Sequence, residues 1–129
     1  MRKEITVALE NKPGVLGCLC KCLAQKKVNV LAISVHESAN VGIVRFVADK
    51  PAVATRILCG CCPLTMSTCE VLELRAPNKP GVLAGIASKL GKKKINIDYV
   101  YGSAARGGKA ALILKPSNLK KAMKLLRGM

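Results

Sequence analysis

The sequence predicts an α+β fold built from two tandem βαββαβ units with antiparallel sheets. The first observation behind this prediction is an internal repeat, in which Asn-Lys-Pro-Gly-Val-Leu at residues 11–16 returns letter for letter at residues 78–83, an offset of 67 residues. The second is that apolar segments typical of strands surround segments with helical apolar spacing, in the same order after each copy. Two repeats are too few for a solenoid, so we expect two copies of one small module.

The first copy begins with a strand and a helix joined by the repeated turn. Residues 4–9 alternate between apolar and polar side chains, as in a half-buried strand. In the turn at residues 11–14, Pro fixes its own φ and Gly permits backbone angles that other residues avoid. Apolar residues at helical spacing then predict an amphipathic helix over residues 14–26, and its basic end at Lys26 and Lys27 suits the helix dipole.

Two strands, a helix and a further strand follow in the first copy. Branched apolar residues predict strands at 28–35 and 42–48, joined by a hairpin turn. Pro51 is suited to the first turn of a helix, which we expect to run to about Leu58. Residues 64–69 predict a short fourth strand. This order of strands and helices is that of a ferredoxin-like unit.

The second copy follows almost without a linker, so we assign residues 1–69 to the first module and residues 70–129 to the second. Its predicted elements are a strand at 70–76, the repeated turn, a helix to about Lys93, strands at 95–102 and 108–115, and a last helix capped by Ser117. The sequence supplies no fourth strand for this module. One edge of its sheet should therefore be covered by a partner, by the first copy, or by nothing.

The repeated turn and the strands around it resemble the ACT domain, a small ligand-binding regulatory module of amino-acid-metabolising enzymes that also occurs in free-standing tandem proteins. The resemblance rests on the strand ending at Leu9, the Asn-Lys-Pro-Gly-Val-Leu turn, and residues 28–30, which are matched by residues 95–97. It covers nearly the whole chain. It implies that two paired modules bind an effector, often an amino acid, at their interface, with the turn as one wall.

Carried onto this chain, the resemblance implies a ligand-binding set in each copy. The two sets are Asn11, Pro13, Gly14, Val15, Leu16 and Asn29 in the first copy, and Asn78, Pro80, Gly81, Val82, Leu83 and Asn96 in the second. The chemistry of these residues is compatible with a zwitterion. Backbone N–H groups at a helix N-terminus favour a carboxylate, and an Asn side chain both donates and accepts hydrogen bonds.

Two further glycines, Gly17 and Gly85, fall inside the predicted helices. Glycine weakens a helix unless another group approaches the backbone closely. We therefore expect tight helix packing at these two positions rather than room for a ligand.

The seven cysteines fit reduced thiols better than a disulfide framework, because their number is odd and no export signal is visible. Cys18 and Cys22 share one face of the predicted helix and Cys20 does not, so these three are poorly placed to bind one ion. A better set for a metal lies later in the chain, at Cys59, Cys61, Cys62 and Cys69. Its spacing is not that of a common zinc site. We expect mostly packing thiols, and neither a metal nor a cofactor.

The chain carries a formal charge of +15, from 22 basic and seven acidic side chains, which would attract nucleic acid at low salt. Only Phe46, Tyr99 and Tyr101 are aromatic, which gives little surface for stacking on bases, and no recognised nucleic-acid motif is present. Catalysis has little support, because the sequence shows no acid pair, no nucleophile with a matching base and no glycine-rich phosphate motif.

We therefore predict a non-catalytic, cytoplasmic regulatory protein that binds an amino acid or related carboxylate. It would pass the signal to a regulated enzyme or through a homo-oligomer. The apolar runs are too short to predict a membrane span. A basic nucleic-acid-associated protein and a ligand-free dimerisation module stay open as alternatives.

Overall fold

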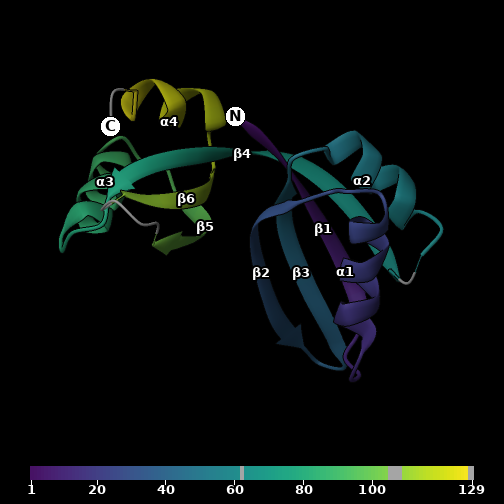
Figure 1. Cartoon of the computed structure of the whole chain (residues 1–129). Helices are drawn as coiled ribbons and strands as arrows, with labels where there is room; N and C mark the ends of the chain where they lie inside the picture. The colour runs from purple at the N-terminus through teal and green to yellow at the C-terminus, as the bar shows by residue number, and fades with distance from the viewer. Residues whose placement is uncertain (62, 105–108, 128–129) are drawn as a thin grey trace. The chain divides into compact units, whose positions relative to one another are not determined.

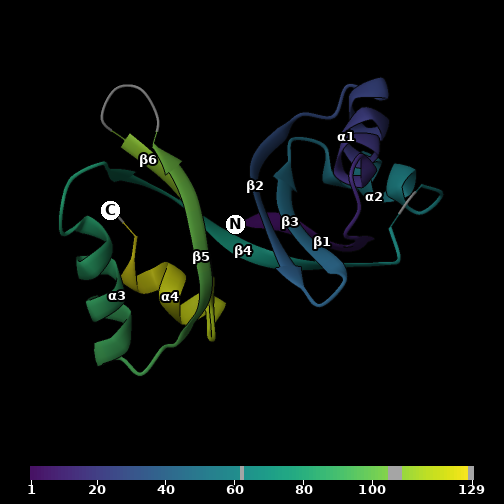
Figure 2. The ribbon, with the colours of Figure 1, turned by 90° about the horizontal axis from the view of Figure 1, so that it is seen from below.

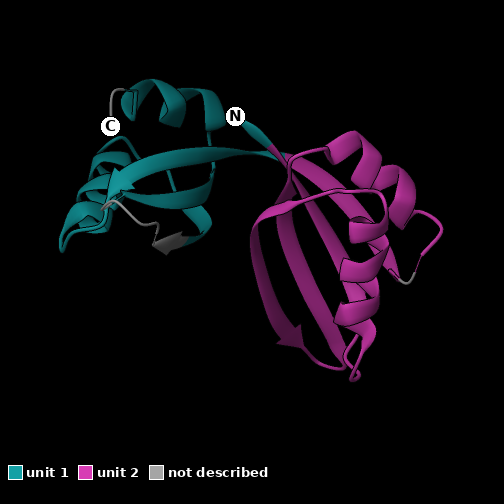
Figure 3. Ribbon diagram, viewed as in Figure 1, with its two compact units in different colours: residues 1–2, 70–129 teal, residues 3–69 magenta. Residues whose placement is uncertain are grey.

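The structure is a computed structural model, and it describes residues 1–61, 63–104 and 109–127. The chain divides into two compact units (Figure 3). One unit comprises residues 3–69, and the other comprises residues 70–129 together with Met1 and Arg2. Each unit is an antiparallel sheet packed against two helices, so the predicted α+β class with two ferredoxin-like modules is confirmed.

The unit of residues 3–69 has the full ferredoxin-like set of elements. They are β1 (Arg2–Glu10), α1 (Val15–Gln25), β2 (Val30–Ser38), β3 (Val41–Ala48), α2 (Pro51–Leu58) and the first part of β4 (Thr65–Pro77). Its strands are hydrogen-bonded in the order β2-β3-β1-β4, and β1 pairs antiparallel with β3 from Glu4 opposite Val47 to Glu10 opposite Val41. Figures 1 and 2 show α1 and α2 on the same face of this sheet.

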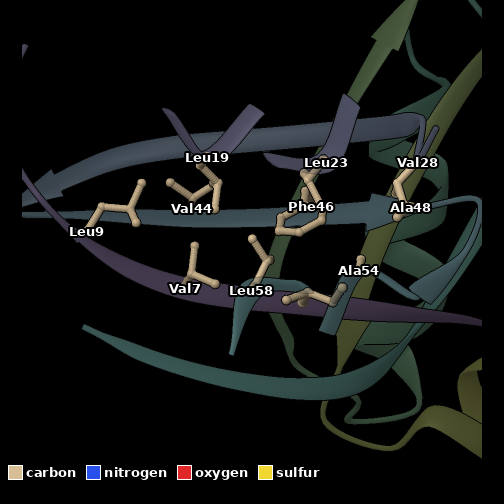
Figure 4. Close-up of a cluster of buried hydrophobic side chains, with 11 residues drawn as sticks. Val7, Leu9, Leu19, Leu23, Val28, Val44, Phe46, Ala48, Ala54 and Leu58 are labelled. Carbon is tan, nitrogen blue, oxygen red and sulfur yellow. The ribbon is translucent and has the colours of Figure 1, made fainter. Parts of the chain in front are cut away.

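The core of this unit lies between that sheet face and the two helices (Figure 4). Phe46 of β3 is fully buried, and Leu19 and Leu23 of α1 pack over it with Leu58 of α2. Burying such a side chain contributes roughly 1.5–3 kcal/mol. The helical spacing of Leu19 and Leu23 and the alternation along β1 therefore meet in one apolar layer, as the sequence predicted.

A lysine in a left-handed conformation follows the end of helix α1. Lys27 has φ 58°, and Val28 N donates to the Leu23 carbonyl at 3.0 Å across this bend. Lys94 repeats the conformation with φ 59° after the corresponding helix of the second copy. In the Schellman motif, the N–H of the residue after a left-handed residue donates a hydrogen bond to one of the last carbonyls of the helix, as Val28 N does here.

The unit of residues 70–129 contains the second part of β4 with α3 (Val82–Lys92), β5 (Ile97–Ala104), β6 (Lys109–Pro116) and α4 (Leu119–Leu125). Its strands follow the order β4-β6-β5, and its core draws on β4, β6, α3 and α4. The part of this unit that the structure describes has no fourth strand of its own. Met1 and Arg2 belong to this unit, and Arg2 Nε lies 2.8 Å from Glu73 Oε2 of β4.

Two sequence predictions in this region are wrong. The strands predicted at 64–69 and 70–76 are one continuous strand, β4, because Thr65–Pro77 contains no residue that breaks a strand before Pro77. The cap of the last helix is Asn118 rather than Ser117: Asn118 Oδ1 accepts from Lys121 N at 3.1 Å. Ser117 Oγ instead accepts from Asn96 N at 2.9 Å.

Candidate functional site

The repeated turn places a left-handed glycine directly before a helix. In the first copy, Gly14 has φ 88° and ψ −14° and is the N-cap of α1. Val15 N donates to the Lys12 carbonyl at 3.3 Å, and Asn11 N donates to the Asn40 carbonyl at 3.1 Å. Because a side chain at such a positive φ is strained, this turn favours glycine.

The second copy forms the same turn. Gly81 has φ 88° and ψ −12° and is the N-cap of α3. Val82 N donates to the Lys79 carbonyl at 3.4 Å, and Gly85 N donates to the Gly81 carbonyl at 3.0 Å. The identical six-residue sequences thus produce the same backbone twice.

Both helix N-termini lack a side-chain cap. The glycine N-cap offers no acceptor, and neither α1 nor α3 has an acidic residue in its first turn. The amides of Leu16 and Gly17 have no acceptor within α1, because the first N–H groups of a helix have no helical carbonyl four residues before them. Such a helix end carries partial positive charge, so each turn is suited to an external anion such as a carboxylate.

A cavity of about 420 Å³ opens beside α1 in the first copy. It is lined by Gly14, Gly17, Cys18, Lys21, Cys22 and Gln25. Its volume lies within the roughly 300–1,000 Å³ of small-molecule sites. Lys21 brings a cation to the lining and Gln25 brings an amide, while Gly14 connects the cavity to the turn.

The expectation of tight packing at Gly17 and Gly85 is wrong. Both residues are exposed. Apart from the backbone of its own helix, a Cβ added at either position would meet no heavy atom of the described residues within 4 Å. At Gly17 the missing side chain leaves open space in the cavity lining. A helical glycine at this point therefore provides room rather than a helix contact.

The turn residues of the two predicted ligand-binding sets have matching exposure. Val15 and Val82 are partly buried against the cores of their units, and the other turn residues are exposed. The exposed residues are Asn11, Pro13, Gly14 and Leu16 in the first copy and Asn78, Pro80, Gly81 and Leu83 in the second. Leu16 is 38% exposed and Leu83 is 47% exposed. These two leucines are apolar surface that each turn can offer to a ligand or partner.

Asn29 and Asn96 are not brought to the turn of their own copy. Each follows the C-terminus of the helix that the turn begins, and 11 helical residues span about 16 Å. Asn29 N donates to Asp49 Oδ1 at 2.9 Å, and Asp49 N donates to the Asn29 carbonyl at 3.0 Å. Asn96 and Ser117 form the same two-way pair at 2.9 and 2.8 Å. Both asparagines thus anchor the start of a strand.

An exposed ion pair lies at the start of the first turn. Lys12 Nζ is 2.9 Å from Glu10 Oε2. The hydrogen bond and charge of Lys12 lower the pKa of Glu10, and the same pair raises the pKa of Lys12. Lys12 is therefore partly neutralised by a neighbour, whereas Lys21 of the cavity lining has no ion-pair partner among the described residues.

The cysteine cluster in the structure differs from the sets weighed in the sequence. Cys18, Cys22 and Cys61 form a group whose Sγ atoms all lie within 4.8 Å of one another. Cys69 Sγ instead donates to buried Glu4 Oε1 at 3.7 Å, and Cys62 lies outside the described residues. The expectation of reduced thiols is wrong for one pair, because the structure joins Cys22 and Cys61 as a disulfide. The closeness of Cys61 to α1 depends on helix packing, which cysteine spacing does not show.

The two copies form a tandem pair of ferredoxin-like modules, each with the same left-handed glycine before its first helix. The family model of the ACT domain pair matches residues 2–127. The chain therefore belongs to the ACT domain family, as the turn and strand resemblance predicted. No curated protein matches the chain significantly.

Solved structures support the same fold. The crystal structure of protein BT0572 from Bacteroides thetaiotaomicron is 29% identical, covers 98% of this chain and 86% of its own, and has a TM-score of 0.89. The structure of aspartokinase alpha and beta subunits is 18% identical, with 97% and 89% coverage and a TM-score of 0.71. The ligand-free regulatory subunit of aspartate kinase from Thermus thermophilus is 14% identical, with 96% and 89% coverage and a TM-score of 0.72.

The helices of the described residues are short. None of them is long and apolar enough to cross a membrane.

Proposed function

We propose that the chain is a regulatory protein that binds a small carboxylate, with an amino acid as the preferred class, at the glycine turn before α1 and at the equivalent turn before α3. The carboxylate would accept hydrogen bonds from the first-turn amides. The remainder of the ligand would occupy the space beside the helix. In the first copy Lys21 would contact it.

The observation that carries this proposal is the pairing of an uncapped helix N-terminus with a cavity of suitable size. Gly14 belongs to both, since it is the N-cap of α1 and lines the cavity of about 420 Å³. An uncapped helix end attracts anions, and the cavity adds one cation and one amide. The same N-cap geometry at Gly81, within 2° in ψ, supports a second carboxylate position.

Family membership and fold support the regulatory part of the proposal. Two structures that share the fold are named as aspartokinase subunits and as a regulatory subunit of aspartate kinase. By this fold-level analogy, the chain would act on an enzyme rather than catalyse a reaction. A ligand can shift such a partner only through its different affinity for two states.

Self-association is the route by which this chain would transmit binding. Strand β2 is at the edge of its sheet, and Leu31, Ile33 and Val35 along it are 40%, 43% and 49% exposed. Edge strands with exposed apolar side chains favour pairing with another chain. Ile33→Lys should lower the mass measured by light scattering if β2 forms the contact, and an unchanged mass would exclude this edge.

A thermal-shift screen of the full chain against the twenty amino acids and simple branched and aromatic carboxylic acids tests the ligand proposal. At a free ligand concentration about 100 times Kd, binding adds roughly 2.7 kcal/mol to the stability of the folded state. Gly17→Phe should remove the response of the first copy, because it fills the cavity without changing the left-handed turn. Ala84→Phe, at the equivalent position of α3, should remove the response of the second copy in the same way.

Low and moderate salt separate the proposal from the basic alternative. A selective, saturable shift that survives moderate salt and is reduced in Gly17→Phe supports a carboxylate site. A uniform lack of response to every acid would reject the proposal. Salt-sensitive retention of RNA or DNA in a separate binding assay would then favour the nucleic-acid function.

A further inference from the structure

Three thiols from separate elements converge beside the cavity in the first copy. Cys18 and Cys22 lie one turn apart on α1, and Cys61 follows the C-terminus of α2. Their Sγ atoms all lie within 4.8 Å of one another. Cys22 and Cys61 are partly buried, and Cys18 is exposed beside them at the cavity lining. The three sulfur atoms therefore surround one point at the edge of the cavity.

Helix α1 holds the backbones of Cys18 and Cys22, and a hydrogen bond to the end of α2 holds that of Cys61. Cys18 and Cys22 are fixed by α1, whose buried face includes Leu19 and Leu23. Cys61 N donates to the Leu58 carbonyl at 3.2 Å, which ties it to the last turn of α2, and Cys61 itself packs against the core. The cluster is therefore positioned by the fold and not by flexible side chains alone.

When the bond between Cys22 and Cys61 is reduced, the backbone geometry also suits an ion shared by the two sulfur atoms. The Cα atoms of Cys22 and Cys61 are 7.4 Å apart. Disulfides usually need a Cα separation of roughly 4.4–6.8 Å. Two thiolates bound to one tetrahedral Zn²⁺ at about 2.3 Å each are about 3.8 Å apart. The two backbone segments therefore need to approach each other less for a shared ion than for a disulfide.

We propose that in the reduced chain Cys18, Cys22 and Cys61 bind one Zn²⁺-class ion as thiolates, with the fourth coordination position open to the cavity. The donor set is entirely sulfur, which selects thiophilic ions over Mg²⁺ or Ca²⁺. Zinc accepts three protein ligands and leaves its fourth position to water or another small molecule. Each thiol gives its proton to solvent as its sulfur binds, so affinity rises with pH.

The repeat shows that this cluster is not a requirement of the fold. At the offset of 67 residues, Gly85 corresponds to Cys18 and Lys89 corresponds to Cys22. Helix α3 therefore has the same backbone without the thiols. The metal site belongs to the first copy alone, and it does not depend on the carboxylate ligand proposed above.

Titration of the fully reduced chain with Co²⁺, a spectroscopic substitute for Zn²⁺, tests the site. We expect one Co²⁺ per chain, a sulfur-to-cobalt charge-transfer band in the near ultraviolet, visible bands of tetrahedral intensity, and displacement by Zn²⁺. Zn²⁺ should also protect three of the seven thiols from alkylation, as counted by mass spectrometry. Loss of a supporting group near a metal costs about 10–100-fold in affinity, so loss of a direct ligand should cost at least about 100-fold.

Cys18→Ser is the decisive variant, because Cys18 is exposed and its replacement leaves the core intact. Cys20→Ser, also exposed on α1 but outside the cluster, is its matched control and should keep the bands. Circular dichroism checks that Cys22→Ser and Cys61→Ser remain folded. Absence of the charge-transfer band in the reduced chain, binding of Cu⁺ but not Co²⁺, or equal loss in Cys18→Ser and Cys20→Ser would each overturn the assignment.

Discussion

Gly14 and Gly17 lie within one turn of each other, yet alanine should act on them in opposite directions. Gly14 has φ 88°, a left-handed conformation that costs an ordinary residue about 1–2 kcal/mol. Part of this cost is offset, because alanine lowers the entropy of the unfolded chain by about 0.4–1 kcal/mol. Gly14→Ala should therefore destabilise the chain by about 1 kcal/mol.

Gly17 lies inside α1, and no neighbouring described atom would lie within 4 Å of a new Cβ there. Gly17→Ala should stabilise the helix by roughly 0.5–1 kcal/mol, because alanine loses less backbone freedom on folding. For a unit of this size, 1 kcal/mol corresponds to about 4–8 °C in Tm. Gly14→Ala should thus melt lower than the wild type and Gly17→Ala higher.

Circular dichroism during urea and thermal unfolding measures both shifts. The chain has no Trp, and both tyrosines, Tyr99 and Tyr101, lie in the unit of residues 70–129, so tyrosine fluorescence follows that unit alone. Gly81→Ala, with φ 88° in the second copy, should repeat the loss seen with Gly14→Ala. A stabilising Gly14→Ala or a destabilising Gly17→Ala would refute the placement of the helix start between these two glycines.

Three further predictions follow from the fold. Lys27→Gly should stabilise the chain by about 1 kcal/mol in urea unfolding, because Lys27 has φ 58° after the end of α1 and glycine is not strained at this angle. If the variant gains no stability, the described end of the helix is wrong. Phe46→Ala should cost about 3–5 kcal/mol in the same assay, since Phe46 is fully buried, and a cost below 1 kcal/mol would contradict the described core. Lys12→Met should return the pKa of Glu10 toward its ordinary 4.5 in an NMR titration, because Lys12 lowers it. The stabilisation from this lowered pKa is complete above pH 4.5 and is lost as the pH falls through the folded-state pKa of Glu10. Lys12→Met should therefore make stability depend less on pH in this range. An unchanged titration of Glu10 would show that the ion pair does not form.

Local chemistry made much of the fold predictable. The helix predicted over residues 14–26 is Val15–Gln25, and the helix predicted to begin at Pro51 does so. Apolar periodicity determines which face of a helix is buried, and proline at the first helical position has no hydrogen bond to lose. Both signals are contained within about ten neighbouring residues, so they can be recognised in the sequence.

The errors arose where the outcome depends on contacts far apart in the chain. The break predicted between residues 69 and 70 came from the repeat boundary, although no glycine or proline lies there and β4 continues through it. Cys61 lies 39 residues from Cys22, and only the packing of α2 beside α1 brings their sulfur atoms together.

The two copies share a backbone, but they present different chemistry along the helix that follows the turn. The five non-turn positions that line the first cavity, Gly17, Cys18, Lys21, Cys22 and Gln25, correspond in the second copy to Ala84, Gly85, Ser88, Lys89 and Lys92. Backbone amides set the preference for a carboxylate, whereas side chains select the rest of a ligand. The second copy has two lysines where the first has a cysteine and a glutamine. A ligand with a second negative group should therefore bind the second copy more tightly, and Lys89→Gln should remove that preference while leaving the response of the first copy to its own ligand unchanged.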